Sequence, residues 1–329
     1  MSTANATSDK LAPERWLRGW HAGWERFWFT PSPPHTLALL RILAGGMLLY
    51  THLVWTIDFS AFFGPTAWVN NSTARLMNQS VDGTNFAFSH LWQTESLPLL
   101  WTMHVLALLV FAALFVGFYT RVSSVLACIL TLSYCHRLAG TLFGLDQVNA
   151  LFATYLMLGR CGDVWSVDHW LATRRSAGQT PVIENSVGTT IAIRLIQLHL
   201  CVIYIFGGLT KLRGDLWWDG SALWFAFASY EYQSLDMTWM VRWPALIAAV
   251  AHATIIWEVF YPAFAFNRQT RPIAIGMAIL VHGGIAIALG MKTFGLAMIF
   301  ANLSFLYPSE SAWLVGKVVS LLRLPSGVK

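Results

Sequence analysis

Long apolar segments alternate with short polar ones along most of the chain, and this pattern predicts membrane-spanning helices. A helix rises about 1.5 Å per residue, so about 20 apolar residues are needed to cross a hydrocarbon layer about 30 Å thick. Eight segments reach or approach this length, which predicts an all-α transmembrane helix bundle of about eight spans. The predicted spans are residues 36–57, 98–118, 122–140, 145–160, 188–210, 244–266, 273–291 and 293–308.

The composition agrees with a polytopic membrane protein. Only 11% of the 329 residues are charged and 56% are hydrophobic, whereas soluble domains carry about 25% charged residues. Mean hydropathy is +0.54. The high apolar content also excludes a disordered chain, and the 4 cysteines are too few for a disulfide-stapled secreted domain.

The basic residues indicate an orientation. If the predicted loops are numbered from a cytoplasmic N-terminus, 13 of the 21 lysine and arginine residues fall on the inner side and 6 on the outer side. Positive residues are retained on the cytoplasmic side of membranes, so both termini are predicted to be cytoplasmic. This bias explains the net charge of +5 without nucleic acid, for which no basic stripe with interleaved aromatic residues is present.

The predicted organisation has one membrane domain. Residues 1–35 form a cytoplasmic N-terminal segment with no apolar run typical of a cleavable signal peptide, and residues 309–329 form a cytoplasmic C-terminal tail. Two long outer loops, 58–97 and 212–243, are rich in aromatic residues and are predicted to be folded caps. On the inner side, residues 165–175 predict a short interfacial helix with Asp168 as its N-cap.

The predicted fifth span carries a stripe of polar and small residues at spacings of three and four, which places them on one face of a helix. The stripe consists of Arg194, Gln197, Cys201, Tyr204, Gly208 and Lys211. Two interpretations stay open. The stripe lines a polar cavity, or it is a packing seam in which the glycines allow a neighbouring helix to approach closely.

Other polar residues lie in or beside apolar spans, where they are costly and therefore candidates for function. They are Asp146 and Gln147 at the outer start of the fourth span, Glu258 in the sixth and His282 in the seventh. Each also has a structural interpretation: His282 as a hydrogen-bonded core histidine, and Glu258 as a partner of an arginine or of hydrogen-bond donors. No zinc, hydrolase or phosphate-loop motif is present in the sequence, so no metal site is predicted.

An ordered set of motifs resembles a known family. YIFGGLTKLRGDLWWDG (204–220), preceded by WSVD (165–168) and followed by HGGIAIALGMKTFGLAM (282–298), resembles the membrane part of vitamin K-dependent γ-glutamyl carboxylase and its bacterial relatives, the horizontally transferred transmembrane (HTTM) domain proteins. LALLRILAGGMLLY (37–50) and LFVGFYTRVSSVL (114–126) extend the resemblance over about residues 24–308. It implies a helical membrane domain in the inner membrane of a bacterium.

The resemblance also implies roles for individual residues. Lys211 matches the lysine base that acts on vitamin K hydroquinone, His282 matches a family histidine, and Glu258 matches an acidic residue. We expect His282 to polarise or orient the substrate. A second family histidine is replaced by Asp146 or Gln147 in GLDQVNAL (144–151). The implied substrate is a quinol, used with O₂ and CO₂ if the reaction is a carboxylation.

Two features leave the activity open. The carboxylase's large lumenal domain, which recognises its protein substrate, has no counterpart in this sequence, so carboxylation of a protein would require a partner protein. A bacterial relative acts with a partner in maturing a secreted peptide toxin, and a non-catalytic module that assists peptide maturation or export is therefore the alternative.

The chemistry expected of Lys211 depends on its surroundings. A lysine in water is protonated at neutral pH, but apolar surroundings favour the neutral amine that can act as a base. The aromatic side chains of Trp217, Trp218 and Phe206 suggest a pocket for a flat ring, and Tyr204 and Trp218 are candidates for binding the substrate. Asp215, four residues further on, suggests instead a salt bridge that would keep Lys211 charged.

Overall fold

The computed structural model describes residues 13–80, 83–84, 86–176, 179 and 181–322, and this part of the chain is helical. The only pairing of extended backbone among these residues is an isolated antiparallel bridge between Ser32 and Ser186. In chain order the elements are α1 (Pro13–Phe29), α2 (His35–Ile57), α3 (Phe59–Phe63), α4 (Asn71–Met77), η2 (His90–Gln93), α5 (Leu97–Val116), α6 (Thr120–Arg137), α7 (Gly144–Leu156), α8 (Val167–Arg175), α9 (Val187–Lys211), α10 (Asp215–Trp218), α11 (Ala222–Ala228), η3 (Thr238–Arg242), α12 (Pro244–Val259), α13 (Tyr261–Phe266), α14 (Arg271–Ala288), α15 (Lys292–Asn302), η4 (Leu303–Phe305) and α16 (Pro308–Leu322).

The all-helical fold is confirmed, but the prediction of eight spans is confirmed only for four of them. Among the described residues, α2, α5, α9 and α14 are long and apolar enough to cross a membrane. Each of the other four predicted segments also contains a helix. These helices are too short or too polar to meet the same criterion; α7, with 13 residues, is about 20 Å long.

Local sequence explains why two of these segments fall short. The predicted span 244–266 is divided at Phe260 into α12 and α13, and Pro262 lies in the first turn of α13. Proline is tolerated there because the first turn of a helix has no backbone acceptor for its missing N–H. The segment 293–308 is likewise divided, because α15 ends at Asn302 and the chain continues as the 3-10 turn η4.

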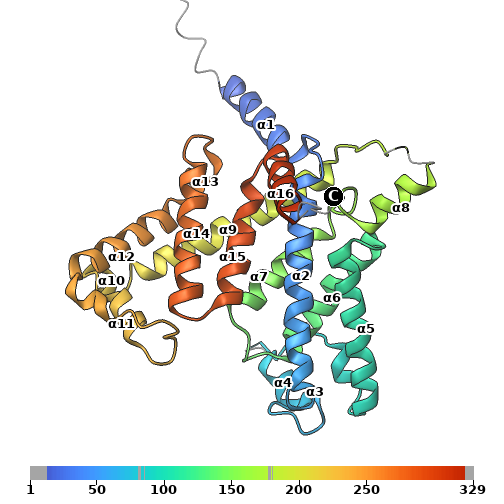
Figure 1. The fold of residues 1–329 in the computed structure, drawn as a ribbon, viewed down its shortest axis with the longest axis horizontal. Helices are drawn as coiled ribbons and strands as arrows, with labels where there is room; N and C mark the ends of the chain where they lie inside the picture. Colours follow the sequence, from blue (N-terminus) through green and yellow to red (C-terminus); the bar gives the residue numbers. More distant parts are fainter. Residues whose placement is uncertain (1–12, 81–82, 85, 177–178, 180, 323–329) are drawn as a thin grey trace, which may run out of the picture.

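Helix α2 lies at the centre of the bundle and takes part in two hydrophobic cores (Figure 1). Leu37, Leu40 and Ala44 pack into the core formed with α7, α9 and α12 to α15. Leu48, one turn beyond, belongs to the second core, which it shares with α3, α5 and α6. The polar residues of α9 face the first of these cores.

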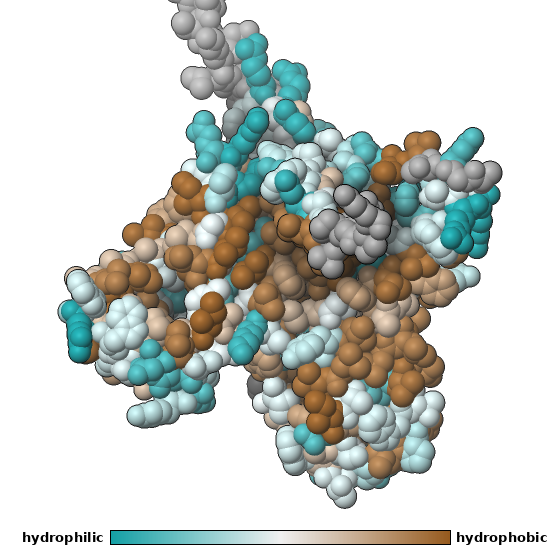
Figure 2. All heavy atoms as spheres, viewed as in Figure 1, coloured by the Kyte–Doolittle hydropathy of each residue, from teal (hydrophilic) through white to brown (hydrophobic). Residues whose placement is uncertain are grey.

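The two ends of the bundle differ in what they carry. Helices α1, α8 and α16 lie at one end, and α3 and α4 lie at the other (Figure 1). The predicted loop caps, 58–97 and 212–243, contain short helices as expected. Apolar side chains cover much of the surface between the ends, whereas hydrophilic residues gather on α1 and α8 (Figure 2). This distribution suits a protein surrounded by lipid at its middle.

Three hydrogen bonds of the buried Arg41 fix the end of the bundle that carries α8. Arg41 is fully buried and its guanidinium donates to the carbonyl oxygens of Leu114 and Phe115 at 3.0 Å and of Trp165 at 2.6 Å. These contacts join α2 to the end of α5 and to the segment before α8.

The predicted N-cap of the interfacial helix was wrong. Ser166 caps α8 by accepting a hydrogen bond from the His169 N–H at 2.9 Å. Asp168 instead accepts hydrogen bonds from the backbone N–H groups of Tyr119, at 2.8 Å, and Thr120, at 2.7 Å. Its carboxylate therefore satisfies free donors at the start of α6, a contact between elements that local spacing does not encode.

Candidate functional site

The polar stripe of α9 faces the interior of the bundle. Gln197, Cys201, Tyr204 and Gly208 are all buried, and Gln197 donates to the carbonyl oxygen of Ser304 at 2.7 Å. The middle of the stripe is thus a packing seam with hydrogen bonds across it, while its Arg194 end lines a cavity. Both interpretations left open by the sequence apply, each to a different part of the helix.

Lys211, the last residue of α9, forms an ion pair with Glu258 of α12. Its Nζ lies 2.6 Å from one carboxylate oxygen and 2.9 Å from the other. The side chains are 24% and 10% exposed, respectively, so water reaches the pair only in part. Lys211 also lies 5.4 Å from the centre of the Trp217 ring. The alternative partner suggested by the sequence, Asp215, forms no ion pair with it.

Gly208 allows α9 and α12 to approach closely enough for this pair to form. A Cβ atom at Gly208 would lie 2.8 Å from Val259 Cγ2 and 3.0 Å from the Val259 backbone nitrogen. These distances are shorter than van der Waals contact, and the second involves backbone that cannot rotate away. A larger residue here would push the helices apart and separate Lys211 from Glu258.

A second polar group lies one to two turns away in the same core. Tyr204 OH is 2.8 Å from His282 Nε2 of α14 and accepts a hydrogen bond from Asn302 Nδ2 of α15 at 2.8 Å. Tyr261 OH donates to Asn302 Oδ1 at 2.6 Å. These four side chains come from α9, α13, α14 and α15, so the group joins four helices through hydrogen bonds.

In this group, the chemistry of Asn302 determines which atom donates and which accepts in each hydrogen bond. Asn302 Nδ2 also donates to the Met298 carbonyl oxygen at 2.9 Å, which fixes the orientation of the amide. Because Nδ2 can only donate, the Tyr204 hydroxyl accepts from it and has its own hydrogen free for His282 Nε2. A neutral His282 then carries its proton on Nδ1, which is buried and has no hydrogen-bond partner among the described residues.

The two groups are neighbours. Trp257, directly before Glu258, packs against Tyr204 with ring centres 4.6 Å apart and also contacts His282, at 6.3 Å between ring centres. Lys211 is near enough for its positive charge to act on the imidazole ring of His282. The structure therefore brings four of the predicted residues into one region: Lys211, Glu258, Tyr204 and His282.

Of the other three predicted site residues, Asp146 and Gln147 lie apart from this region, and Trp218 lies at its edge, beside the end of α9. Asp146 accepts a hydrogen bond from the Phe143 N–H at 3.1 Å, which caps α7, and it lines a separate cavity of about 340 Å³. Gln147 is exposed on the surface of α7. Trp218 is 63% exposed, and its indole donates to the Leu212 carbonyl oxygen at 2.8 Å.

Sequence analysis missed Asn302 and Tyr261, and it also missed a polar cluster in the second core. There, His104 lies 2.7 Å from Tyr134 OH and 2.9 Å from Thr56 Oγ1. The signal was available, because Asn302 and His104 are isolated polar residues in apolar runs. The described residues contain no group of three or more histidine, cysteine or acidic side chains able to hold a metal ion.

Comparisons with known proteins identify the family. Residues 29–310 match the family profile of the HTTM domain. The sporulation-delaying protein SdpB of Bacillus subtilis (strain 168) is 29% identical over 122 residues, which is 35% of this chain and 38% of that protein. The match thus spans less than half of SdpB, and no solved structure matches the chain. Because the family profile covers most of its length, the chain belongs to the HTTM domain family.

Proposed function

We propose that the protein is a bacterial membrane enzyme that removes a proton from a membrane-soluble hydroxyl compound of the quinol class, with Lys211 as the base. The observation that carries this proposal is the contact of Lys211 with both oxygens of Glu258. An ion pair favours the charged ammonium, so the base forms only when one proton moves from the ammonium to the carboxylate and leaves a neutral amine. That amine can accept a proton from a substrate hydroxyl, and Glu258 holds the displaced proton.

His282 has the geometry of a substrate-orienting group in this proposal. Its Nε2 is occupied by Tyr204, which holds the ring in place and leaves the proton on Nδ1. A buried N–H without an acceptor stabilises a substrate oxygen that bears negative charge. On the same substrate molecule, His282 would therefore act as a hydrogen-bond donor and Lys211 as a base.

The surroundings of Lys211 suit an aromatic ring that approaches from the lipid. Trp217 presents its face to the ammonium, and Phe206 and Trp218 are 65% and 63% exposed. Exposed aromatic side chains at this position offer a flat apolar contact for a quinol head group. When bound, the quinol supplies the acidic hydroxyl, and the chain supplies the base and the oxygen-facing donor.

A second candidate is a non-catalytic module that assists maturation or export of a secreted peptide together with a partner protein. Two observations favour it. Lys211 is held in an ion pair with Glu258, and its side chain is only 24% exposed. In addition, part of the chain is similar to a sporulation-delaying protein. In this role Lys211 contributes a charge and need not lose its proton.

Mass spectrometry of an organic extract of the purified protein separates the two candidates. The enzyme proposal expects a co-purified quinone in the wild type and its loss from the double variant Lys211→Met/Glu258→Gln, which removes both charges together. Lys292→Met, which replaces an exposed lysine of α15, is the matched control and should retain the quinone. Equal quinone content in wild type and double variant would favour the non-catalytic module.

A further inference from the structure

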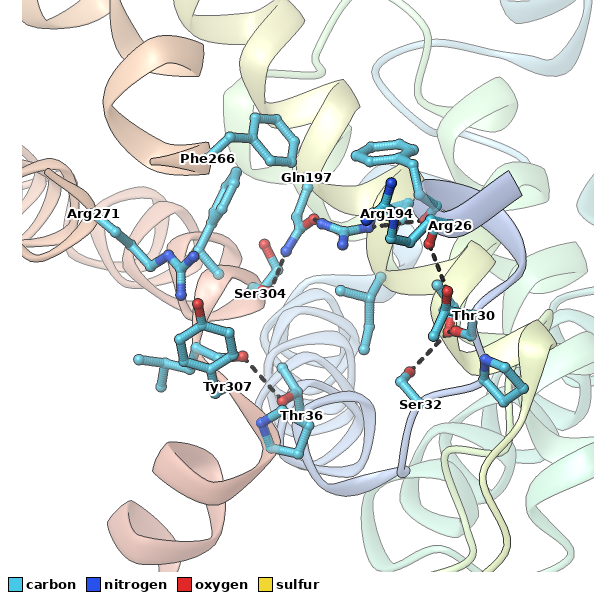
Figure 3. Close-up of a pocket in the computed structure, with 17 residues that line it drawn as sticks. Arg26, Thr30, Ser32, Thr36, Arg194, Gln197, Phe266, Arg271, Ser304 and Tyr307 are labelled. Atoms are coloured by element: carbon cyan, nitrogen blue, oxygen red, sulfur yellow. Dashed lines mark hydrogen bonds between the residues drawn. The ribbon is translucent and has the colours of Figure 1, made fainter. Parts of the chain in front are cut away.

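A large cavity lies at the opposite end of α9 from Lys211 (Figure 3). Its volume is about 720 Å³, and it is open on one side. Its wall is formed by the end of α1, the start of α2, the first half of α9, α13 with the start of α14, and the segment from η4 to α16. Arg194, on its wall, precedes Lys211 by 17 residues of one helix, which is about 25 Å along the axis. The cavity is therefore separate from the Lys211 region.

Three arginines from three different helices line this cavity and no acidic residue does. They are Arg26 of α1, Arg194 of α9 and Arg271 of α14. Within the described residues, none of the three forms an ion pair with a carboxylate. Arg194 and Arg271 are close enough for their charges to repel. Positive charges gathered without a counter-charge are unfavourable in a partly apolar site, and an anionic ligand would remove that cost.

The protein positions these guanidinium groups but leaves most of their donors unused. Arg194 stacks on the Phe27 ring at 4.4 Å and uses two donors: Nε donates to the Phe27 carbonyl oxygen at 3.3 Å, and Nη1 donates to Gln197 Oε1 at 2.9 Å. Arg271 lies 4.3 Å from the centre of the Tyr307 ring and donates only from Nε, to the Ala265 carbonyl oxygen at 3.3 Å. Aromatic stacking holds the planar groups, and their remaining N–H groups match the oxygens of a phosphate.

Apolar side chains, among them Ile193, Phe266, Phe305 and Leu306, make up another part of the cavity wall, and hydroxyl-bearing residues such as Thr36 and Thr190 also line it. The helix that supplies Arg26 also carries exposed tryptophans one turn apart, Trp16, Trp20 and Trp24. Tryptophan concentrates at the level of lipid head groups. The cavity thus combines a cationic part with an apolar part and adjoins a helix suited to the membrane interface.

We propose that this cavity binds the phosphate-bearing head group of an anionic amphiphile, with the three arginines around the phosphate and the apolar wall against the start of its hydrocarbon part. Basic pockets between membrane helices bind anionic head groups in this way. The phosphate is the recognised group, and a membrane phospholipid and a soluble phosphate compound are its two sources.

Native mass spectrometry of the protein released from lipid nanodiscs tests the proposal. Nanodiscs of phosphatidylcholine containing phosphatidylglycerol supply the lipid, and inorganic phosphate added to phosphatidylcholine-only nanodiscs supplies the soluble source. We expect a phosphatidylglycerol adduct on the wild type. Arg194→Gln/Arg271→Gln should weaken its binding by at least about tenfold, because each lost contact to a charged group is worth that much or more.

The controls address folding and general charge effects. Arg175→Gln, at the end of α8 and outside the cavity, removes an exposed charge at the same end of the bundle and should bind as the wild type does. Arg26→Gln alters no contact between α9 and α14, so it should lower lipid binding several-fold without changing the melting temperature. It replaces the double variant in the test if the double variant does not fold.

Each outcome of these binding measurements either supports or overturns the proposed phosphate site. Arginine-dependent retention of phosphatidylglycerol supports a lipid head group, and arginine-dependent binding of inorganic phosphate alone supports the same site with a soluble ligand. The proposal would be overturned if the wild type, Arg26→Gln and the double variant retained equal amounts of phosphatidylglycerol. It would also be overturned if the wild type preferred neither phosphatidylglycerol nor phosphate over phosphatidylcholine.

Discussion

Tyr204 satisfies two polar partners at a point in the core where water is excluded. Its hydroxyl accepts from Asn302 and donates to His282, and all three residues are buried. A buried polar atom that loses its partner costs more free energy than the hydrogen bond contributes when intact. The His282 ring therefore depends on this hydroxyl both for its tautomer and for its position.

Tyr204→Phe should lower the free energy of unfolding by about 1–3 kcal/mol, because it leaves His282 Nε2 without a donor while keeping the aromatic packing. The melting temperature in detergent measures the effect. Tyr155→Phe is the matched control, since Tyr155 also contacts a histidine, His199, at 3.1 Å but in an exposed position, and it should change the melting temperature little. Equal effects of the two substitutions would refute a structural role for the buried hydroxyl.

The candidate site residues in the apolar spans were predictable one by one but not as pairs. Lys211, Glu258, Tyr204 and His282 are conspicuous in the sequence because polar groups in apolar spans are costly. The sequence suggested Asp215 as the partner of Lys211 because it is four residues away. The actual partner is 47 residues away, and helix packing decides that pairing. Asp146 met the same criterion, yet it caps its own helix.

At the level of the helices, the close crossing of α9 and α12 brings Lys211 into contact with Glu258. Gly208→Ala should lower the free energy of unfolding by about 1–3 kcal/mol, because the added methyl group meets the Val259 backbone. Thermal melting gives the measurement. Gly284→Ala in α14 is the control: nothing lies within 4 Å of its added Cβ, and alanine is favoured over glycine inside a helix. Destabilisation by both substitutions would argue against a specific close approach.

The positions of the helices were predictable from the apolar segments, but their lengths were less so. All eight segments contain helices, since long apolar runs favour them. Polar residues of α6 such as Ser123 and Ser124 are buried against other helices and reduce its apolar character below that of a typical span. The break at Phe260 depends on Pro262 within a run that is otherwise continuously apolar.

At the level of the whole molecule, the placement of α8 and α11 suggests a test of the predicted orientation. Tyr230→Cys introduces a thiol where the native side chain is 94% exposed, and it should react with an impermeant maleimide added to intact cells. Arg175→Cys, at the exposed end of α8, should react only after permeabilisation. The native cysteines give little background because three are buried and Cys135 is partly so. If only Arg175→Cys were labelled in intact cells, the orientation would be the opposite of the predicted one.

The rate of quinol consumption by Lys211→Arg distinguishes the proposed role of Lys211 as a base from that of a fixed charge. Arginine can keep the ion pair with Glu258, but a guanidinium does not give up its proton in a protein. With menaquinol, O₂ and CO₂ supplied to the protein in nanodiscs, we expect consumption by the wild type and a rate at least about 100-fold lower for the variant. Quinol consumption by Lys211→Arg at the wild-type rate, or no quinol consumption by the wild type, would show that Lys211 is not the base.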